Sequence, residues 1–298
     1  MWFKNLQIFR LPNSGELTLE AIEARLAGHP LQPCEGGLPS SFGWVPPCAD
    51  GALAHSVDRQ WLLALGSERK LLPASVVKRH VKDRARLIEE DEGRRVGRRE
   101  LRDLHAAITQ ELLPRAFVDK RTTHAWIDPA GGWLAIDAAA PARADELIEQ
   151  LHKAVDKLRI LPLKTMRSPS AAMTDWVADG EAPAGFSIDQ DMELRSAENA
   201  VVRYARHPLD GEEIRAHIAT GKVVTRLGMT WGDRISFVLD DKLQLKRLNF
   251  LDILKESTEG QAENEEERFD LDFALMAGEL ARLLDDLLAA LGGEPPPR

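Results

Sequence analysis

The chain has 298 residues, 44% of them hydrophobic and 29% charged, and its formal net charge at pH 7 is -9. These values are ordinary for a soluble globular protein with a real core, and the acidic chain as a whole does not resemble a nucleic-acid binder. No apolar run reaches the roughly 18 residues of a membrane span, and residues 1–10 alternate in polarity instead of forming a signal peptide. We therefore expect a soluble, cytoplasmic protein with no membrane partner.

The average charge hides a strong segregation along the chain. Residues 78–102 contain ten Lys/Arg and six Asp/Glu, whereas residues 252–272 contain nine Asp/Glu and two Lys/Arg. Such asymmetry permits a basic working surface on an acidic body.

The two cysteines, Cys34 and Cys48, do not form a close metal-binding pair, and too few histidines lie near them in the sequence for a zinc site. We expect two reduced thiols in a cytosolic protein, and we expect no cofactor and no metal.

The first 72 residues alternate short strands with one helix. Residues 19–27 predict a helix capped by Thr18, and a loop rich in Gly and Pro follows it up to Pro47. Residues 2–11 predict a strand, and residues 52–57 and 61–65 predict a hairpin or two short strands.

Residues 73–117 predict a helical hairpin with a basic side on each arm. The first helix extends from Pro73 to about residue 92, Gly93 and Gly97 separate it from the second, and the second stops at Pro114. Spacings of three and four residues place apolar residues on one face of each helix and basic residues beside them. The apolar residues are Val77, Val81, Ala85 and Ile88, then Leu101, Leu104, Ile108 and Leu112. The basic residues are Lys78, Lys82 and Arg86, then Arg94, Arg98 and Arg102.

Arg115 and Phe117 follow directly after the stop at Pro114, where a turn should expose them. A basic helix that ends in an exposed aromatic tip indicates contact with something long and negatively charged.

The remaining chain predicts two further groups of elements. A β-β-α-β layer comprises strands 122–128 and 133–138, a helix at 143–158 and a strand at 159–163. The later elements are a helix at 169–178, strands 185–188, 192–195 and 201–206, a helix at 211–220 capped by Asp210, a meander of strands 222–231, 234–239 and 243–250, and a long C-terminal helix.

These elements predict an α+β protein of several antiparallel sheet and helix layers with a protruding helical finger. We expect residues 1–72 and 165–298 to form the sheet and helix body, and residues 73–164 to form the finger with its adjoining β-β-α-β layer.

The basic hairpin has two interpretations. Rows of Lys and Arg could bind a phosphate backbone by displacing its counterions, or they could form a solvated face paired with Asp83, Glu89 and Glu90. Phe117 could insert into a partner subunit or pack on DNA, or it could fold back onto its own hairpin. Further cations that could join a basic surface are Lys164, Arg167, Lys222, Arg226, Lys246 and Arg247.

Enzyme signatures are poor. The chain lacks G-x-x-x-x-G-K-[ST], H-E-x-x-H and G-x-S-x-G, and it has no G-x-G-x-x-G after a strand. Asp189 and Asp191 could hold Mg²⁺ as in a nuclease, although loop acids more often cap helices or face water. Residues 265–267 are three glutamates that precede a helix, where negative charge favours the helix N-terminus.

Eight short phrases, in order, resemble the RdgC family of bacterial recombination-associated proteins over essentially the whole chain. The phrases are Trp2-Phe3-Lys4-Asn5-Leu6, Gly43-Trp44-Val45-Pro46-Pro47, Leu112-Leu113-Pro114-Arg115-Ala116-Phe117, Trp126-Ile127-Asp128, Gly221-Lys222-Val223-Val224-Thr225, Leu245-Lys246-Arg247-Leu248, Arg268-Phe269-Asp270 and Gly278-Glu279-Leu280.

The resemblance implies a homodimer that closes into a ring around duplex DNA, binds it with little sequence preference and restrains RecA-driven strand exchange. It therefore implies a nucleoid-associated protein without catalysis. By the same resemblance, Phe117 sits at the finger tip in the contact that closes the ring, and Arg115 matches a tip arginine implicated in DNA binding or gate closure. Arg206 and His207 lie where the family has a basic-polar pair near this gate, and His207 replaces the usual glutamine.

The finger's basic residues vary in the family, so the two basic stripes rest on helical geometry. Two alternatives stay open: a metal-dependent nuclease that uses the acidic residues, and a protein-only module that binds the recombinase without DNA.

Overall fold

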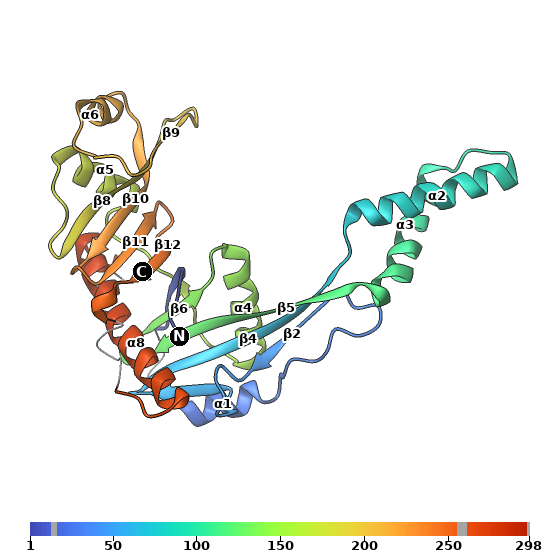
Figure 1. Cartoon of the computed structure of the whole chain (residues 1–298), viewed down its shortest axis with the longest axis horizontal. Coiled ribbons are helices and arrows are strands. Elements are labelled where there is room, and N and C mark those ends of the chain that lie inside the picture. Colours follow the sequence, from blue (N-terminus) through green and yellow to red (C-terminus); the bar gives the residue numbers. More distant parts are fainter. Residues whose placement is uncertain (13–16, 255–260, 297–298) are drawn as a thin grey trace.

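The computed structural model describes residues 1–12, 17–254 and 261–296 and shows an α+β fold, as predicted. Its centre is one twelve-stranded sheet whose named strands pair antiparallel, in the order β2-β4-β5-β6-β1-β12-β11-β10-β8-β9, with β3 beside β4 and β7 beside β1. Figure 1 shows an open, curved molecule in which the α2–α3 hairpin projects from one end and α6 with β9 lies at the other.

The sheet has two halves. The first half contains β1 (Leu6–Arg10), β2 (Ser40–Val45), β3 (Ala54–Val57), β4 (Gln60–Leu71), β5 (Phe117–Asp128), β6 (Trp133–Asp137) and β7 (Leu161–Pro162). The second half contains β8 (Phe186–Arg195), β9 (Val201–Tyr204), β10 (Val223–Trp231), β11 (Ile235–Asp240) and β12 (Leu245–Phe250). The halves meet where β1 pairs with β12, in a register of one residue pair, Leu6 with Leu245.

Seven α-helices and one 3₁₀ turn have described bounds. They are α1 (Leu19–Leu26), α2 (Ala74–Glu92), α3 (Arg98–Leu112), η2 (Leu113–Arg115), α4 (Pro141–Ala154), α5 (Pro169–Asp179), α6 (Glu212–Ala219) and α8 (Glu265–Ala290). None of the helices in the described part of the chain combines the length and the apolar character needed to cross a bilayer.

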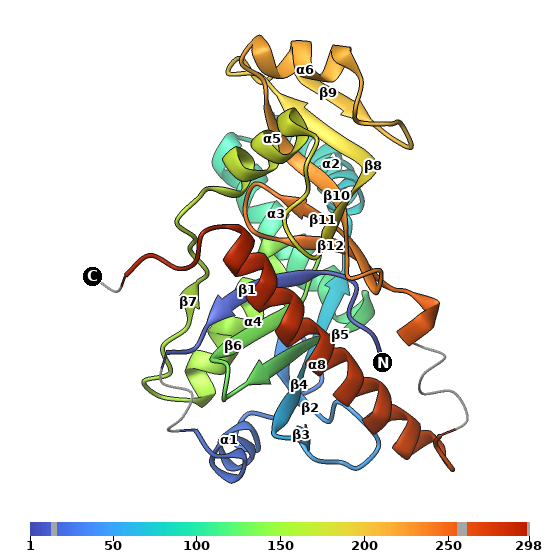
Figure 2. The same cartoon turned by 90° about the vertical axis from the view of Figure 1, so that its left-hand side faces the viewer.

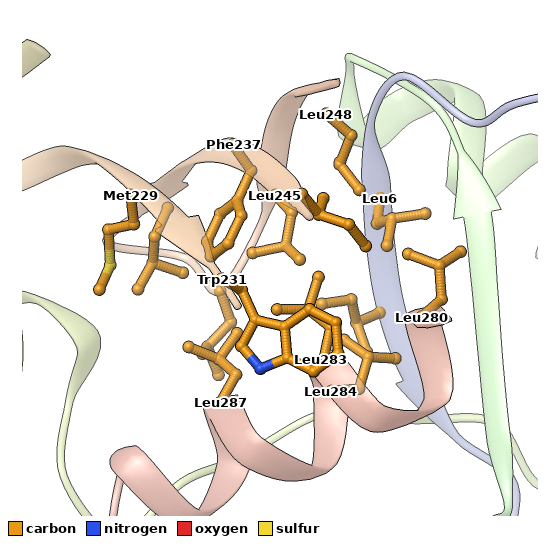
Figure 3. Close-up of a cluster of buried hydrophobic side chains, with 14 of the residues drawn as sticks. Leu6, Met229, Trp231, Phe237, Leu245, Leu248, Leu280, Leu283, Leu284 and Leu287 are labelled. Atoms are coloured by element: carbon orange, nitrogen blue, oxygen red, sulfur yellow. The ribbon is translucent and has the colours of Figure 1, made fainter. Parts of the chain in front are cut away.

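Helix α8 packs across the joint between the two halves. Its apolar side chains Leu280, Leu283 and Leu287 are fully or almost fully buried against residues of both halves, among them Leu6 and Trp231. Figure 3 shows these side chains gathered between α8 and the strands, and Figure 2 shows α8 running diagonally over the sheet. The Trp231 indole N–H also donates to Asp286 of α8, at 2.8 Å. One continuous core therefore joins the two halves.

A second core lies on the other face of the first half, under α1 and α4. Alternation along β5 separates the cores, because Trp126 belongs to the α8 core while Ala125 and Ile127 face Leu147 of α4. As predicted, the side chain of Thr18 caps α1 by accepting from the Ala21 N–H.

The structure corrects several predicted boundaries. Residues 40–45, assigned to a loop, form β2, in which Gly43 is required because a Cβ there would collide with the backbone of Pro30 and Leu31. Residues 186–195 form one irregular strand, β8, instead of two strands. Asp210 does not cap α6, because Gly211 occupies the cap position.

Residues 1–72 contact both of the predicted units. Strands β1 and β4 pair with β6 and β5 of residues 117–163, whereas β1 also pairs with β12, and Phe3, Leu6 and Leu62 share the α8 core with the second half-sheet.

Leu283→Ala should lower the free energy of unfolding by about 2–5 kcal/mol, because the side chain is fully buried between the sheet halves and its removal leaves a cavity. Urea denaturation of both proteins measures the difference. The matched control is Asp285→Ala, an exposed position on the same helix, which should change stability by less than about 0.5 kcal/mol. Equal effects at the two positions would contradict the role of α8.

Candidate nucleic-acid interface

A long two-stranded ribbon carries the helical hairpin away from the body (Figure 1). Strands β4 and β5 pair continuously from Trp61 and Ile127 to Leu71 and Phe117, and their outer parts lie beyond the cores. The outer strand residues carry charges of both signs, and Lys120 pairs with Glu68 at 2.7 Å across the ribbon. The ribbon is therefore a polar stalk held by backbone hydrogen bonds.

The hairpin is formed by residues that start and stop helices. Pro73 takes the extended N-cap conformation before α2, and Gly93 ends α2 in the left-handed conformation, with φ of 65°. Gly97 precedes α3, and Pro114 lies in η2 directly after it. A small core holds the arms together, and its members are Val77, Val81 and Ile108, packed with Leu72, Leu104 and Leu112.

A groove of about 400 Å³ runs between the two arms. Val81, Ala85 and Leu101 contribute its apolar surface, and the other lining residues are Lys78, Lys82, Arg86, Glu89 and His105. On α3, Arg98 lies three residues before Leu101, and Arg102 lies three residues before His105. Residues three apart share one side of a helix, so both arginines lie on the face of α3 that borders the groove. The predicted stripe on α2 and two of the three predicted arginines on α3 thus flank one groove.

The cations of the groove differ in how far protein carboxylates neutralise them. In residues 1–12, 17–254 and 261–296, no carboxylate lies within ion-pair distance of Lys78, Lys82, Arg98 or Arg102. Arg86 differs from these four, because it lies 3.4 Å from Glu90 in an exposed surface pair. The groove therefore presents uncompensated positive charge.

Arg94 does not belong to the α3 stripe, which corrects the prediction. Because α3 begins only at Arg98, Arg94 lies in the turn between the helices, where its guanidinium contacts Glu100 at 2.8 Å and Glu92 at 2.6 Å. The hydrogen bond to Glu100 and the negative charges of Glu100 and Glu92 raise the pKa of the Arg94 guanidinium above its ordinary value. Its charge is therefore largely satisfied within the hairpin and orders the turn.

Phe117 is exposed as predicted, at 84% of its maximum, but it lies at the base of the helical hairpin and not at the tip. The far end of the hairpin is the turn at 93–97, since β5 starts at Phe117 and pairs at once with Leu71 of β4. Leu71 is 55% exposed, so the two side chains place apolar surface side by side where strands meet helices. Arg115 is exposed in η2, two residues away.

Arg206 and His207 follow β9, at the end of the molecule opposite the hairpin (Figure 1). Arg206 has a left-handed backbone, with φ of 52°, and its N–H donates to Asp191 at 3.0 Å. The ring of His207 stacks at a tilt near Tyr204, with centroids 5.3 Å apart. A single chain therefore does not bring these two residues together with Phe117 or Arg115.

The sequence analysis missed a cluster of arginines on the helix-free face of the second half-sheet. Glu193 of β8 is buried, with a side chain 4% exposed, and lies 2.8 Å from Arg203, 3.2 Å from Arg195 and 3.6 Å from Arg226. Burial raises the pKa of Glu193, but the hydrogen bonds from Arg203 and Thr225 outweigh it and hold this pKa below its ordinary value. One carboxylate thus orders three solvent-accessible cations, of which Arg226 alone was noted from the sequence.

The acidic residues considered for a nuclease are occupied by protein donors. Asp189 accepts from the Thr230 hydroxyl at 3.1 Å, and Asp191 accepts from the Arg206 N–H. Glu267 reaches back to the Glu263 N–H as part of the N-terminal cap of α8. Within the described ranges, these carboxylates do not belong to a group with converging metal-ligand atoms.

The sequence matches the family model described as "Putative exonuclease, RdgC" over residues 1–294. The recombination-associated protein RdgC of Dechloromonas aromatica is 52% identical over 299 residues, covering 99% of this chain and 98% of that protein. The proteins of the same name from Herminiimonas arsenicoxydans and Cupriavidus pinatubonensis are 51% and 52% identical over 296 residues and cover 99% of each chain. The similarity extends over both sheet halves and the hairpin.

Glu193→Gln should lower the free energy of unfolding at pH 7 by about 2 kcal/mol, because charged hydrogen bonds to two arginines are weakened. The folded-state pKa of Glu193 is depressed, so its stabilisation is present above the unfolded-state pKa and is lost as pH falls through the folded value. The difference between the proteins should therefore shrink below about pH 4.5, as measured by urea denaturation across pH.

Glu149→Gln is the control for this prediction, since it removes an exposed pair with Lys153 and should cost less than about 0.5 kcal/mol. If the loss of unfolding free energy caused by Glu193→Gln stayed constant into the acid range, the charge of the carboxylate would not be the cause of that loss.

Proposed function

The chain belongs to the RdgC family, and on this basis we propose that it is a non-catalytic protein that binds duplex DNA with little sequence preference. The observation that carries the proposal is the groove of the α2–α3 hairpin, flanked by Lys78, Lys82, Arg98 and Arg102 without protein counter-charges among the described residues. Such cations bind phosphates by releasing condensed counterions, and phosphates carry no base information.

The partner in solution is a second copy of the same chain, and the dimer closes into a ring around the duplex. Two features support this assembly. The exposed side chains of Phe117 and Leu71 form an apolar contact surface, and the curved chain holds them away from Arg206 and His207 at its other end (Figure 1). A second copy could bring the two ends together, with Arg115 beside Phe117 at the gate.

Closure around DNA explains how an acidic protein could act on recombination. The net charge of -9 disfavours stray binding to DNA, whereas an enclosed basic passage retains the duplex by topology. A ring that occupies duplex DNA in the nucleoid competes with RecA for it and so restrains homologous recombination. The printed name of the relatives, recombination-associated protein, agrees with this role in its general sense.

The family description gives a second candidate, because it includes the word exonuclease. Incubation of linear and circular duplex DNA with the purified chain and Mg²⁺ or Mn²⁺ separates the candidates. We expect binding without shortening, and metal-dependent shortening that is lost in Asp189→Asn would favour the nuclease. Binding to recombinase that persists without DNA, together with no affinity for DNA, would favour the protein-only module.

The double variant Lys78→Gln/Lys82→Gln should weaken binding to duplex DNA equally for unrelated sequences. The plot of log K against log salt concentration has a negative slope, and its magnitude should decrease by about 2 for each hairpin, because two phosphate contacts are lost. Fluorescence anisotropy with labelled duplexes at several salt concentrations measures both quantities.

The control variant Arg84→Gln/Arg94→Gln removes the same number of charges from the same hairpin. These arginines are paired with Glu111 and with Glu92 and Glu100, so their loss should change the salt slope much less. Equal slopes for the two double variants would remove the groove from the DNA interface.

Phe117→Ala should weaken dimerisation by about 2 kcal/mol, or roughly thirtyfold in Kd, because the exposed ring is expected to be buried by the partner. Analytical ultracentrifugation across protein concentration measures this change. Leu87→Ala, at an exposed apolar residue of α2, is the control and should leave the dimer intact. If Phe117→Ala dimerises like the unmodified protein, the ring does not close through this residue.

A further inference from the structure

Cys48, Asp50 and His55 converge on one point between the β2–β3 connection and α8, and their potential ligand atoms lie within 4.8 Å of one another. The geometry points to a binding site for a single Zn²⁺-class transition-metal ion, with Cys48 Sγ, a carboxylate oxygen of Asp50 and His55 Nδ1 as its protein ligands. The site is remote from the hairpin, because β3 and the start of α8 lie at the opposite side of the first half-sheet (Figures 1 and 2).

Packing holds the histidine in one orientation. His55 belongs to β3 and is 8% exposed, and its ring lies 5.6 Å from the ring of Phe269 and 6.2 Å from that of Phe273, both on α8. Asp50 is held by its own turn, in which it accepts the Ala52 N–H at 3.0 Å. Two of the three ligands are thus placed before any ion arrives.

The two ring nitrogens of His55 face different carboxylates. Nε2 lies 2.8 Å from Asp270 of α8, and Nδ1 lies 2.7 Å from Asp50, on the side of Cys48. A metal bound at Nδ1 would replace the hydrogen bond to Asp50 and displace its proton to solvent, while Nε2–H donates to Asp270. A carboxylate that orients a histidine ligand through its other nitrogen is a recurrent feature of protein metal sites, and Asp270 is therefore a positioning residue.

The donor set selects the class of ion. A thiolate and an imidazole favour Zn²⁺ and related transition metals over Mg²⁺ and Ca²⁺, which prefer oxygen ligands. Three protein ligands leave a fourth tetrahedral position for water. The carboxylates of Asp50 and Asp270 beside His55 attract a dication, which deprotonates a bound thiol outright, so binding releases the Cys48 proton to solvent.

The proposed site departs from the expectation that too few histidines lie near the cysteines for a zinc site. His55 follows Cys48 by seven residues, and the turn at Asp50 returns the chain so that their side chains meet. The alternative is a metal-free hydrogen-bond clamp in which His55 bridges Asp50 and Asp270. The metal site and the clamp differ in the role of Cys48, because only the metal site requires its thiol.

The test uses the full chain, stripped with a chelator and dialysed. Titration with Zn²⁺ by calorimetry should show one ion per chain and a raised Tm, and Co²⁺ should give a thiolate-to-metal charge-transfer band in the near ultraviolet. Cys48→Ser should abolish the band. Cys34→Ser should retain it, because Cys34 is buried elsewhere and donates to the Leu38 carbonyl. Asp270→Asn should weaken binding about tenfold to a hundredfold.

Three results would overturn the site: no stoichiometric binding, a band that survives Cys48→Ser, or a band that disappears only in Cys34→Ser. Circular dichroism of each variant establishes that it is folded, and Zn²⁺ affinity that is equal in folded Cys48→Ser and unmodified protein also refutes the proposal.

Discussion

The fold depends on the packing of α8 across the joint between its two half-sheets. Strand pairing at this joint is limited to Leu6 with Leu245, so the hydrogen-bond ladder alone holds the halves weakly. The leucines of α8 supply the missing stabilisation by burying apolar surface against both halves at once. Everything that depends on the relative position of the two ends, including the hairpin and the β9 region, depends on this contact.

The cations of this protein fall into two groups, those that lie close to a carboxylate and those that do not. Arg94 is fully paired and orders a turn, and Glu193 orders three arginines around one buried carboxylate. Lys78 and Lys82 have no such partner within the described ranges. Cations paired within the chain contribute to its stability, whereas unpaired cations can attract a negatively charged ligand. An acidic total charge is compatible with this arrangement because the excess carboxylates lie elsewhere.

Much of the fold could be predicted from periodicity, and the errors have local causes. The apolar spacing of Val77, Val81 and Ile108 predicted the hairpin core, because helical geometry is a property of nearby residues. Strand β2 was missed because Gly43 and two prolines resemble loop signals, although Gly43 is there to admit a neighbouring backbone. Phe117 was placed at the tip because the pairing of β4 with β5, which identifies the anchored end, is not visible in the helical pattern. The cluster of Cys48, Asp50 and His55 also escaped, since the turn that brings these side chains together and the contact of His55 with Asp270, 215 positions away, are not visible in the spacing.

The narrow seam between β1 and β12 has a mechanical consequence. A sheet resists bending through its ladder of hydrogen bonds, and the ladder is shortest here, supplemented by the Leu248 N–H bond to Lys4 at 2.8 Å. We therefore expect the softest deformation of the chain to be a hinge rotation of one half against the other, opposed chiefly by side-chain packing on α8. The stalk and hairpin act as a long lever, so a small rotation at the seam becomes a large change in the span of the concave side. Such a rotation would change the width of the concave side while every helix and strand stays intact.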